Sequence, residues 1–125
     1  MEKVVGIGAV LFKCIDPDVT RKWYKKHLNI GNTAHGHTFS WPTEDKQGGT
    51  STIEWCPFKA DTDYFSPSKV DYMINFRVAN LDYLLNCLKQ EGIVPVGNVE
   101  DTEYGRFAWI MDPDGRKIEL WEPIE

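Results

Sequence analysis

The chain has 125 residues, a formal net charge of −5, and 42% hydrophobic and 26% charged residues. This length fits one domain that can bury its own core, and an acidic balance without a basic cluster argues against a nucleic-acid partner. No apolar run approaches membrane-spanning length, and the opening residues are too short and too interrupted for a signal peptide. The three cysteines have no C-x-x-C spacing, which argues against a disulfide framework or a zinc knuckle. A reduced, cytoplasmic protein is therefore expected.

The first half of the chain predicts a strand, a helix and further strands. Residues 8–15 form an apolar run typical of a strand, and Asp16 followed by Pro17 is a typical helix start, with a capping carboxylate and a proline in the first turn. The helix is expected to reach residue 28. Strands are expected at residues 34–41 and 50–58, with a polar turn at residues 43–49 between them.

The second half repeats this order. A strand is predicted at residues 73–78, a cap at Asn80, and a helix at residues 81–91 that ends before Gly92. Strands are predicted at residues 94–99, 105–111 and 116–121, with a tight Asp-Pro-Asp-Gly turn at residues 112–115. We interpret both halves as β-α-β-β-β modules, at residues 1–58 and 70–125, joined by a linker at residues 59–69. The sequence thus predicts a single α+β domain built by duplication.

Strand alternation assigns one face of each predicted strand to its helix and the other face to a concavity. The helix side is expected to take Val10, Phe12, Cys14, Ile74, Phe76 and Val78. Polar and charged side chains then recur on the opposite face in both halves, which favours a ligand pocket over a solvated face of self-neutralising ion pairs. The candidate ligand-binding residues are Lys13, Trp41, Glu54, Cys56, Asn75, Arg77, Lys117, Glu119 and Trp121.

Three segments of the chain resemble the vicinal oxygen chelate superfamily, which includes glyoxalases, bleomycin-resistance proteins and extradiol dioxygenases. They are residues 15–28, residues 76–82 and, most specifically, the turn and strand at residues 112–123. The resemblance implies paired β-α-β-β-β modules that form an open, barrel-like cup, often in a homodimer. In the metal-dependent members it implies a divalent cation held by a His or Gln on each first strand and a Glu or His on each last strand.

Carried onto this sequence, the last-strand ligand positions fall on Glu54 and Glu119, and the first-strand positions fall on Ala9 and Met73. Alanine has no donor atom, and a thioether suits soft metals rather than hard cations. No metal cofactor is therefore expected, with Glu54 and Glu119 as the ligands if a divalent metal is present. His35 and His37 would share one face of a regular strand and could supply the missing ligands, but the polar sequence around them favours an exposed segment over a metal site.

These expectations favour a protein that binds a small organic or antibiotic-like molecule in its cup without a catalytic metal. Glu54 and Glu119 would orient a cationic or hydrogen-bond-donating group, while Lys13, Arg77 and Asn75 would contact an anionic or carbonyl group. Apolar walls are expected from Trp41 and Trp121, and a flap over the mouth of the cup from Tyr64 and Phe65 in the linker.

Two alternatives stay open from the sequence. One is a divalent-metal-dependent lyase, isomerase or dioxygenase of the same superfamily. The other is a metal-free enzyme in which a cup carboxylate removes a proton from a carbon acid. The sequence leaves undecided whether the protein is catalytic, and whether each cup forms within one chain or across two.

Overall fold

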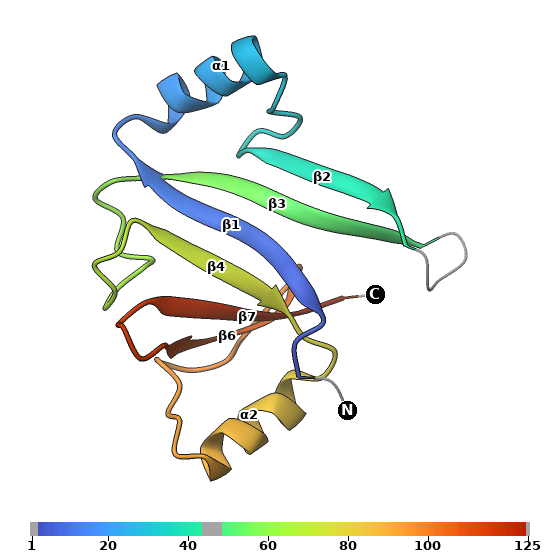
Figure 1. The fold of residues 1–125 in the computed structure, drawn as a ribbon, viewed down its shortest axis with the longest axis vertical. Coiled ribbons are helices and arrows are strands. Elements are labelled where there is room, and N and C mark those ends of the chain that lie inside the picture. The colour runs from blue at the N-terminus through green and yellow to red at the C-terminus, as the bar shows by residue number, and fades with distance from the viewer. Residues whose placement is uncertain (1–2, 44–48, 125) are drawn as a thin grey trace.

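The computed structural model describes residues 3–43 and 49–124 of the chain (Figure 1). The first half contains β1 (Gly6–Cys14), α1 (Pro17–Leu28), β2 (His37–Pro42) and β3 (Thr50–Lys59). The second half contains β4 (Tyr72–Arg77), α2 (Leu81–Gln90), β5 (Glu100–Thr102), β6 (Gly105–Met111) and β7 (Lys117–Pro123). Within the described residues, two strands follow α1 whereas three follow α2.

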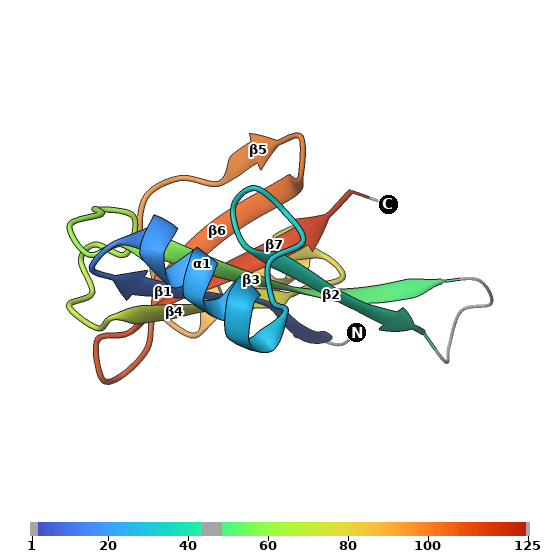
Figure 2. The ribbon, with the colours of Figure 1, turned by 90° about the horizontal axis from the view of Figure 1, so that it is seen from above.

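All strands belong to one mixed sheet with the order β2-β3-β1-β4-β7-β6-β5. The antiparallel pair β1–β4 lies at its centre and joins the two halves, while β1–β3 and β4–β7 are parallel. The two helices lie at opposite ends of the sheet in Figure 1, and Figure 2 shows β5 and β6 curling over one side. The α+β layout of an open, curved sheet is thus confirmed, with strands of both halves in one sheet.

The helix starts follow the predicted capping chemistry. The Asp16 carboxylate accepts hydrogen bonds from the backbone N–H groups of Asp18 (3.0 Å) and Val19 (3.4 Å), and Asn80 accepts one from Tyr83 (2.9 Å). These bonds satisfy amides that have no partner inside the helix. None of the described helices is long and apolar enough to cross a membrane.

Two predicted segments differ from the structure. Residues 94–99 form no strand, because Pro95 lacks an N–H group for the ladder and Gly97 adopts a positive φ of 73°. Residues 34–36 form a bend rather than the start of β2. His35 is therefore exposed before the strand, and the His37 Nδ1 atom accepts hydrogen bonds from the backbone of Gly31 and Asn32. The idea that the two histidines form a metal-binding pair on one strand is wrong.

The buried core lies on both faces of the sheet. On the convex face, α2 packs on a cluster made of Val78, Leu81, Leu84, Ala108 and Leu120, with Phe76 against it, as the strand alternation predicts. On the concave face, a second cluster is made of Ala9, Leu11, Phe65, Met73 and Trp109. The linker residue Phe65 therefore occupies part of the cup.

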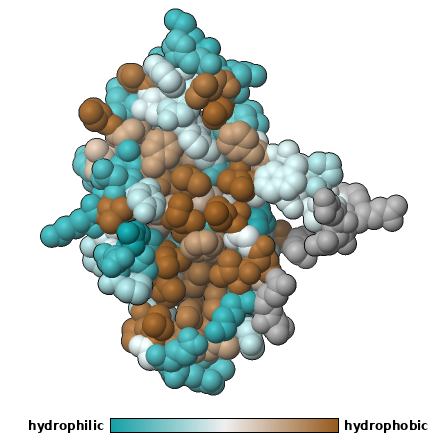
Figure 3. All heavy atoms as spheres, viewed as in Figure 1, coloured by the Kyte–Doolittle hydropathy of each residue, from teal (hydrophilic) through white to brown (hydrophobic). Residues whose placement is uncertain are grey.

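The convex face is less well covered near α1. No residue of α1 is fully buried, and the helix contacts the sheet through Tyr24, whose ring lies 4.6 Å from that of Trp55. Apolar side chains gather over the centre of the sheet between the two helices (Figure 3). On the convex face, to which the strand register assigns Ile7 with Phe76 and Tyr72 with Phe12, Ile7 and Tyr72 are 45% and 41% exposed. This band of apolar surface lies over the central strands β1 and β4 (Figures 1 and 3).

Candidate functional site

One row of side chains runs across the concave face and contains both predicted carboxylates. The register places neighbouring residues of successive strands side by side, so that this row is Thr38, Glu54, Ala9, Asn75, Glu119 and Trp109. Residues opposite one another in adjacent strands point to the same face, which brings these groups to one surface. The row therefore confirms that Glu54, Asn75 and Glu119 share the concave face.

The same register corrects one carried-over position. Asn75 pairs with Glu119 just as Ala9 pairs with Glu54, so Asn75, and not Met73, lies in the first-strand position of the second half. The assignment of that position to Met73 was wrong because it counted residues back from the helix cap. Met73 instead packs against Phe65 and Leu11 in the concave cluster.

Glu119 is held by three donors. Its Oε1 atom accepts a hydrogen bond from Asn75 Nδ2 (2.7 Å), and its Oε2 atom accepts bonds from the Trp109 indole N–H (2.9 Å) and the Tyr64 hydroxyl. The residue is only 3% exposed. A buried carboxylate is stable in a protein only when such donors replace its lost hydration. Both oxygens of Glu119 are thus engaged with the protein itself.

The linker between the halves supplies the third of these donors and fills the space above it. Phe65 is fully buried, and Tyr64 places its ring parallel to that of Phe58. Lys117 donates from Nζ to the backbone oxygen of Tyr64 (2.9 Å) and lies over the Tyr64 ring. Burial and the neighbouring Glu119 charge raise the pKa of Tyr64, so that its hydroxyl stays a donor. The predicted flap over the mouth is therefore wrong, because this segment lies inside the cup.

Glu54 has different surroundings. It is half-buried, and among the described residues its one hydrogen-bonding partner is the Thr38 hydroxyl, which donates to Oε2 over 2.6 Å. Cys56 lies two residues further along the same strand, on the same face. Burial, followed by the charges of Glu54 and Glu119, raises the pKa of the Cys56 thiol to about 11. The thiol is therefore neutral near pH 7 and a weak nucleophile.

Arg77 and Trp121 lie next to this row, towards the end of the sheet where β4 and β7 finish. The Arg77 guanidinium is stacked 4.6 Å from the Trp121 ring, and its Nη2 atom donates to the Thr52 hydroxyl (2.6 Å) and carbonyl (3.4 Å). Burial lowers the pKa of Arg77, an effect that the Glu54 charge opposes. Gly8 makes this packing possible, because a Cβ atom there would lie 2.9 Å from the Trp121 ring.

The remaining predicted residues divide between the two faces. Lys13 lies on the concave side, with Nζ 5.4 Å from the centre of the Phe65 ring. Trp41 does not line the cup, because it pairs with Ser51 and so faces away from Thr52 and Glu54. The sequence alone gave no reliable register for this edge strand, whose burial pattern does not alternate clearly.

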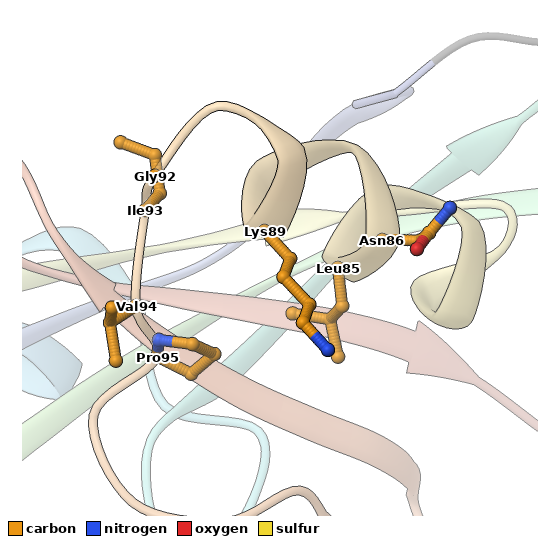
Figure 4. A pocket seen from close by; sticks show the side chains of 7 residues that line it. All are labelled: Leu85, Asn86, Lys89, Gly92, Ile93, Val94 and Pro95. Carbon is orange, nitrogen blue, oxygen red and sulfur yellow. The ribbon is translucent and has the colours of Figure 1, made fainter.

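Two surface hollows border these elements. A groove of about 830 Å³ opens at the end of the sheet where β3 begins and β4 and β7 finish, and Arg77, Ser51 and Glu122 help to line it. A smaller apolar hollow of about 410 Å³ lies between α2 and the loop that follows it, with Leu85, Val94 and Pro95 in its wall (Figure 4). This second hollow is lined entirely by α2 and the adjoining loop, and it contains none of the predicted ligand residues.

The concave residues do not fit a divalent-metal centre of the superfamily kind. No group of three or more His, Cys, Asp or Glu residues that could hold a metal ion occurs within the described part of the chain. Both Glu119 oxygens are taken by N–H and O–H donors, which a metal would have to displace, and Ala9 offers no donor atom. We therefore derive no chemistry through a metal at these residues.

Solved structures share this fold, although no protein-family model and no curated protein sequence matches the chain. Methylmalonyl-CoA epimerase from Mycobacterium tuberculosis aligns over 100% of this chain and 92% of its own, with a TM-score of 0.67 and 20% sequence identity. A Streptomyces coelicolor methylmalonyl-CoA epimerase variant in complex with 2-nitronate-propionyl-CoA covers 98% of this chain and 99% of its own, with a TM-score of 0.65 and 16% identity.

A structure described as an NAD-dependent benzaldehyde dehydrogenase from Legionella pneumophila also aligns, with a TM-score of 0.59 and 13% identity over 93% of this chain and 98% of its own. Identities this low establish the architecture and leave the activity open. The chain has the vicinal oxygen chelate fold, which confirms the resemblance seen in its sequence.

Proposed function

We propose that the protein binds a small organic molecule in the half of the cup that contains Glu54. The observation that carries this proposal is the contrast between the two carboxylates of the concave row. Glu119 is enclosed by three donors, whereas Glu54 has Thr38 as its one hydrogen-bonding partner among the described residues. A half-buried carboxylate with a spare oxygen is suited to a ligand that brings its own donor.

The chemistry around Glu54 specifies the matching part of the ligand. Thr38 fixes the Oε2 atom, so that Oε1 is available to an N–H, O–H or ammonium group. The Cys56 thiol remains protonated beside it and offers a small, neutral contact surface. Trp121 provides an aromatic wall next to the row. A ligand with a donor or a cation on an apolar frame fits these groups.

Ligand screening by thermal shift, followed by calorimetry on the hits, tests the proposal. Glu54→Gln should weaken binding of a hit at least tenfold, about 1.4 kcal/mol, because the charged acceptor is lost. Glu103→Gln removes the same charge from an exposed position and serves as the matched control. Equal affinity of wild type and Glu54→Gln for every hit would contradict the proposal.

A second candidate is an isomerase or lyase of the same fold, with or without an added divalent metal. The epimerase structures that share the fold favour it, and Glu54 would then act as the proton acceptor. The test is exchange of the methylmalonyl-CoA α-proton with D₂O, measured with and without Co²⁺ or Mn²⁺. Exchange that disappears in Glu54→Gln would favour catalysis over binding alone. An exchange rate no higher than that in buffer would favour binding without catalysis.

We also propose that the protein forms a homodimer through the apolar band between its helices. The support is the exposed apolar surface of the central strands, including Ile7 and Tyr72. A patch of this kind on a soluble domain is typical of an interface. Light scattering should show a dimer that Ile7→Lys or Tyr72→Lys dissociates, while Tyr104→Lys at an exposed site elsewhere leaves it intact. A monomeric wild type would refute it.

The compartment we propose is the reducing cytoplasm. All three cysteines of the chain are free thiols, which is ordinary in a reducing compartment. Fractionation of the source cells, with the protein recovered outside the cytosolic fraction, would contradict this assignment.

A further inference from the structure

We infer that Arg77, which lies where the concave row meets the groove at the end of the sheet, binds an anionic group, a carboxylate or a phosphate. The groove encloses about 830 Å³, and Arg77, Ser51, Thr50 and Glu122 contribute to its lining. The Arg77 side of this inference stands on its own geometry. Its link to a second contact at Glu54 rests on the function proposed above.

Three of the four arginines of the chain form ion pairs with aspartates. Arg21 forms an ion pair with Asp18, Arg106 with Asp82 and Asp101, and Arg116 with Asp112 and Asp114. Arg77 is the fourth arginine, and within residues 3–43 and 49–124 no carboxylate lies at ion-pair distance from it. It is also the arginine that lies on the concave face beside the proposed ligand.

Arg77 is already held in place by its neighbours. Trp121 stacks on its guanidinium and Thr52 accepts from Nη2, which leaves the Nε and Nη1 groups without a hydrogen-bonding partner among the described residues. A guanidinium fixed in this way presents a planar fork that matches the two oxygens of a carboxylate or phosphate. Burial disfavours the charge of Arg77, and a bound anion would offset that cost.

The other charges of the groove do not compete strongly for this position. The Glu122 carboxylate accepts a hydrogen bond from the backbone N–H of Leu81 (2.7 Å), at the start of α2. Arg106 is neutralised by its two aspartates. Glu54 is close enough to raise the pKa of Arg77, but it lies at a separate position along β3.

The spacing along β3 adds a length requirement for the ligand. Thr52 contacts Arg77, and Glu54 follows two residues later on the same face. Two residues of a strand span about 6.5–7 Å. The ligand class is therefore a small organic acid or phosphate ester whose anionic group lies about 7 Å from a donor or cationic group.

Titration of ¹⁵N-labelled protein with simple probes tests this inference, with the Trp121 indole and Arg77 guanidinium signals as the readout. Inorganic phosphate and pentanoate probe the anion site, and pentylamine probes Glu54. A series of ω-amino acids from 3-aminopropanoate to 6-aminohexanoate tests the distance between the contacts at Arg77 and Glu54. Pentanoate and phosphate should shift the Arg77 and Trp121 signals, and Arg77→Gln should weaken both at least tenfold. Arg77→Lys, which keeps the charge and volume, should weaken them less, and Arg116→Gln is the surface control.

Within the ω-amino acid series, binding should be tightest for the length that spans Arg77 and Glu54, and Glu54→Gln should remove this dependence of affinity on length. If pentylamine fails to bind while the anions still require Arg77, the proposed role of Glu54 fails and the anion site stands. If phosphate and pentanoate bind Arg77→Gln as well as wild type, or fail to bind wild type, the inference is overturned.

Discussion

Glu54 and Glu119 occupy matching positions in the two halves of the cup, yet the structure uses them differently. Glu119 is enclosed by Asn75, Trp109 and Tyr64, and it is only 3% exposed. Glu54 is half-buried and accepts from the Thr38 hydroxyl. The cause is the linker, because the Tyr64 hydroxyl donates to Glu119, whereas among the described residues Glu54 accepts from Thr38 and from no linker side chain. Equivalent positions in a duplicated fold can therefore have one structural member and one that is free for a ligand.

The largest expected effect comes from removing Phe65, the linker side chain that is buried in the cup beside Tyr64. Phe65→Ala should lower the free energy of unfolding by about 3–5 kcal/mol, because it deletes a fully buried ring from the concave cluster. Urea denaturation measures the loss. Phe39→Ala, at a position that is 39% exposed, should cost less than about 1 kcal/mol. Similar losses for the two variants would show that Phe65 does not fill the cup.

Exchanging each carboxylate for its amide compares the two halves directly. Glu119→Gln should cost about 2–4 kcal/mol of stability, because the amide NH₂ faces buried donors that then lack an acceptor. Glu54→Gln should cost about 1 kcal/mol or less, since it loses one bond at a half-buried site. Denaturant titration of both variants gives the comparison. A larger loss for Glu54→Gln would reverse our assignment of the structural carboxylate.

The contribution of the linker hydroxyl can be isolated with Tyr64→Phe. This change removes one charge-assisted hydrogen bond to Glu119 and keeps the ring, so a loss of about 1.5–3 kcal/mol is expected. Tyr104→Phe, at a position that is 66% exposed, is the control and should change stability by no more than about 0.5 kcal/mol. No difference between the variants would mean that Asn75 and Trp109 alone hold Glu119.

The smallest expected effect is on the pKa of the Cys56 thiol, which the charges of both carboxylates raise. Its pKa of about 11 means that alkylation by iodoacetamide, measured in a Cys14→Ser/Cys87→Ser background, should accelerate until the pH approaches 11. Removing a nearby negative charge favours the thiolate, so Glu54→Gln should lower this pKa. Glu119→Gln should lower it less, because Glu54 is the stronger of the two charge effects. A rate that levels off near pH 8.5 would contradict the raised pKa.

Local sequence patterns predicted the helix starts and the faces of the central strands well. Asp16 and Asn80 cap the helices through hydrogen bonds that involve residues only two or three positions away. Phe76 and Val78 pack beneath α2, as alternation along one strand requires. Predictions that needed the alignment of different strands were less reliable. Met73 was placed where Asn75 lies, and Trp41 was assigned to the wrong face.

The sequence by itself determined the α+β class, the strand–helix–strand order that opens both halves, and the presence of two carboxylates on one concave face. These features follow from capping, turn chemistry and alternation, which act over a few residues. Only the tertiary structure decided which carboxylate is enclosed, because Tyr64 reaches Glu119 across 55 positions of the chain. It also decided that Arg77 lies beside Trp121 without a carboxylate partner among the described residues. Such contacts depend on strand order and register, which bring together residues that no local pattern connects.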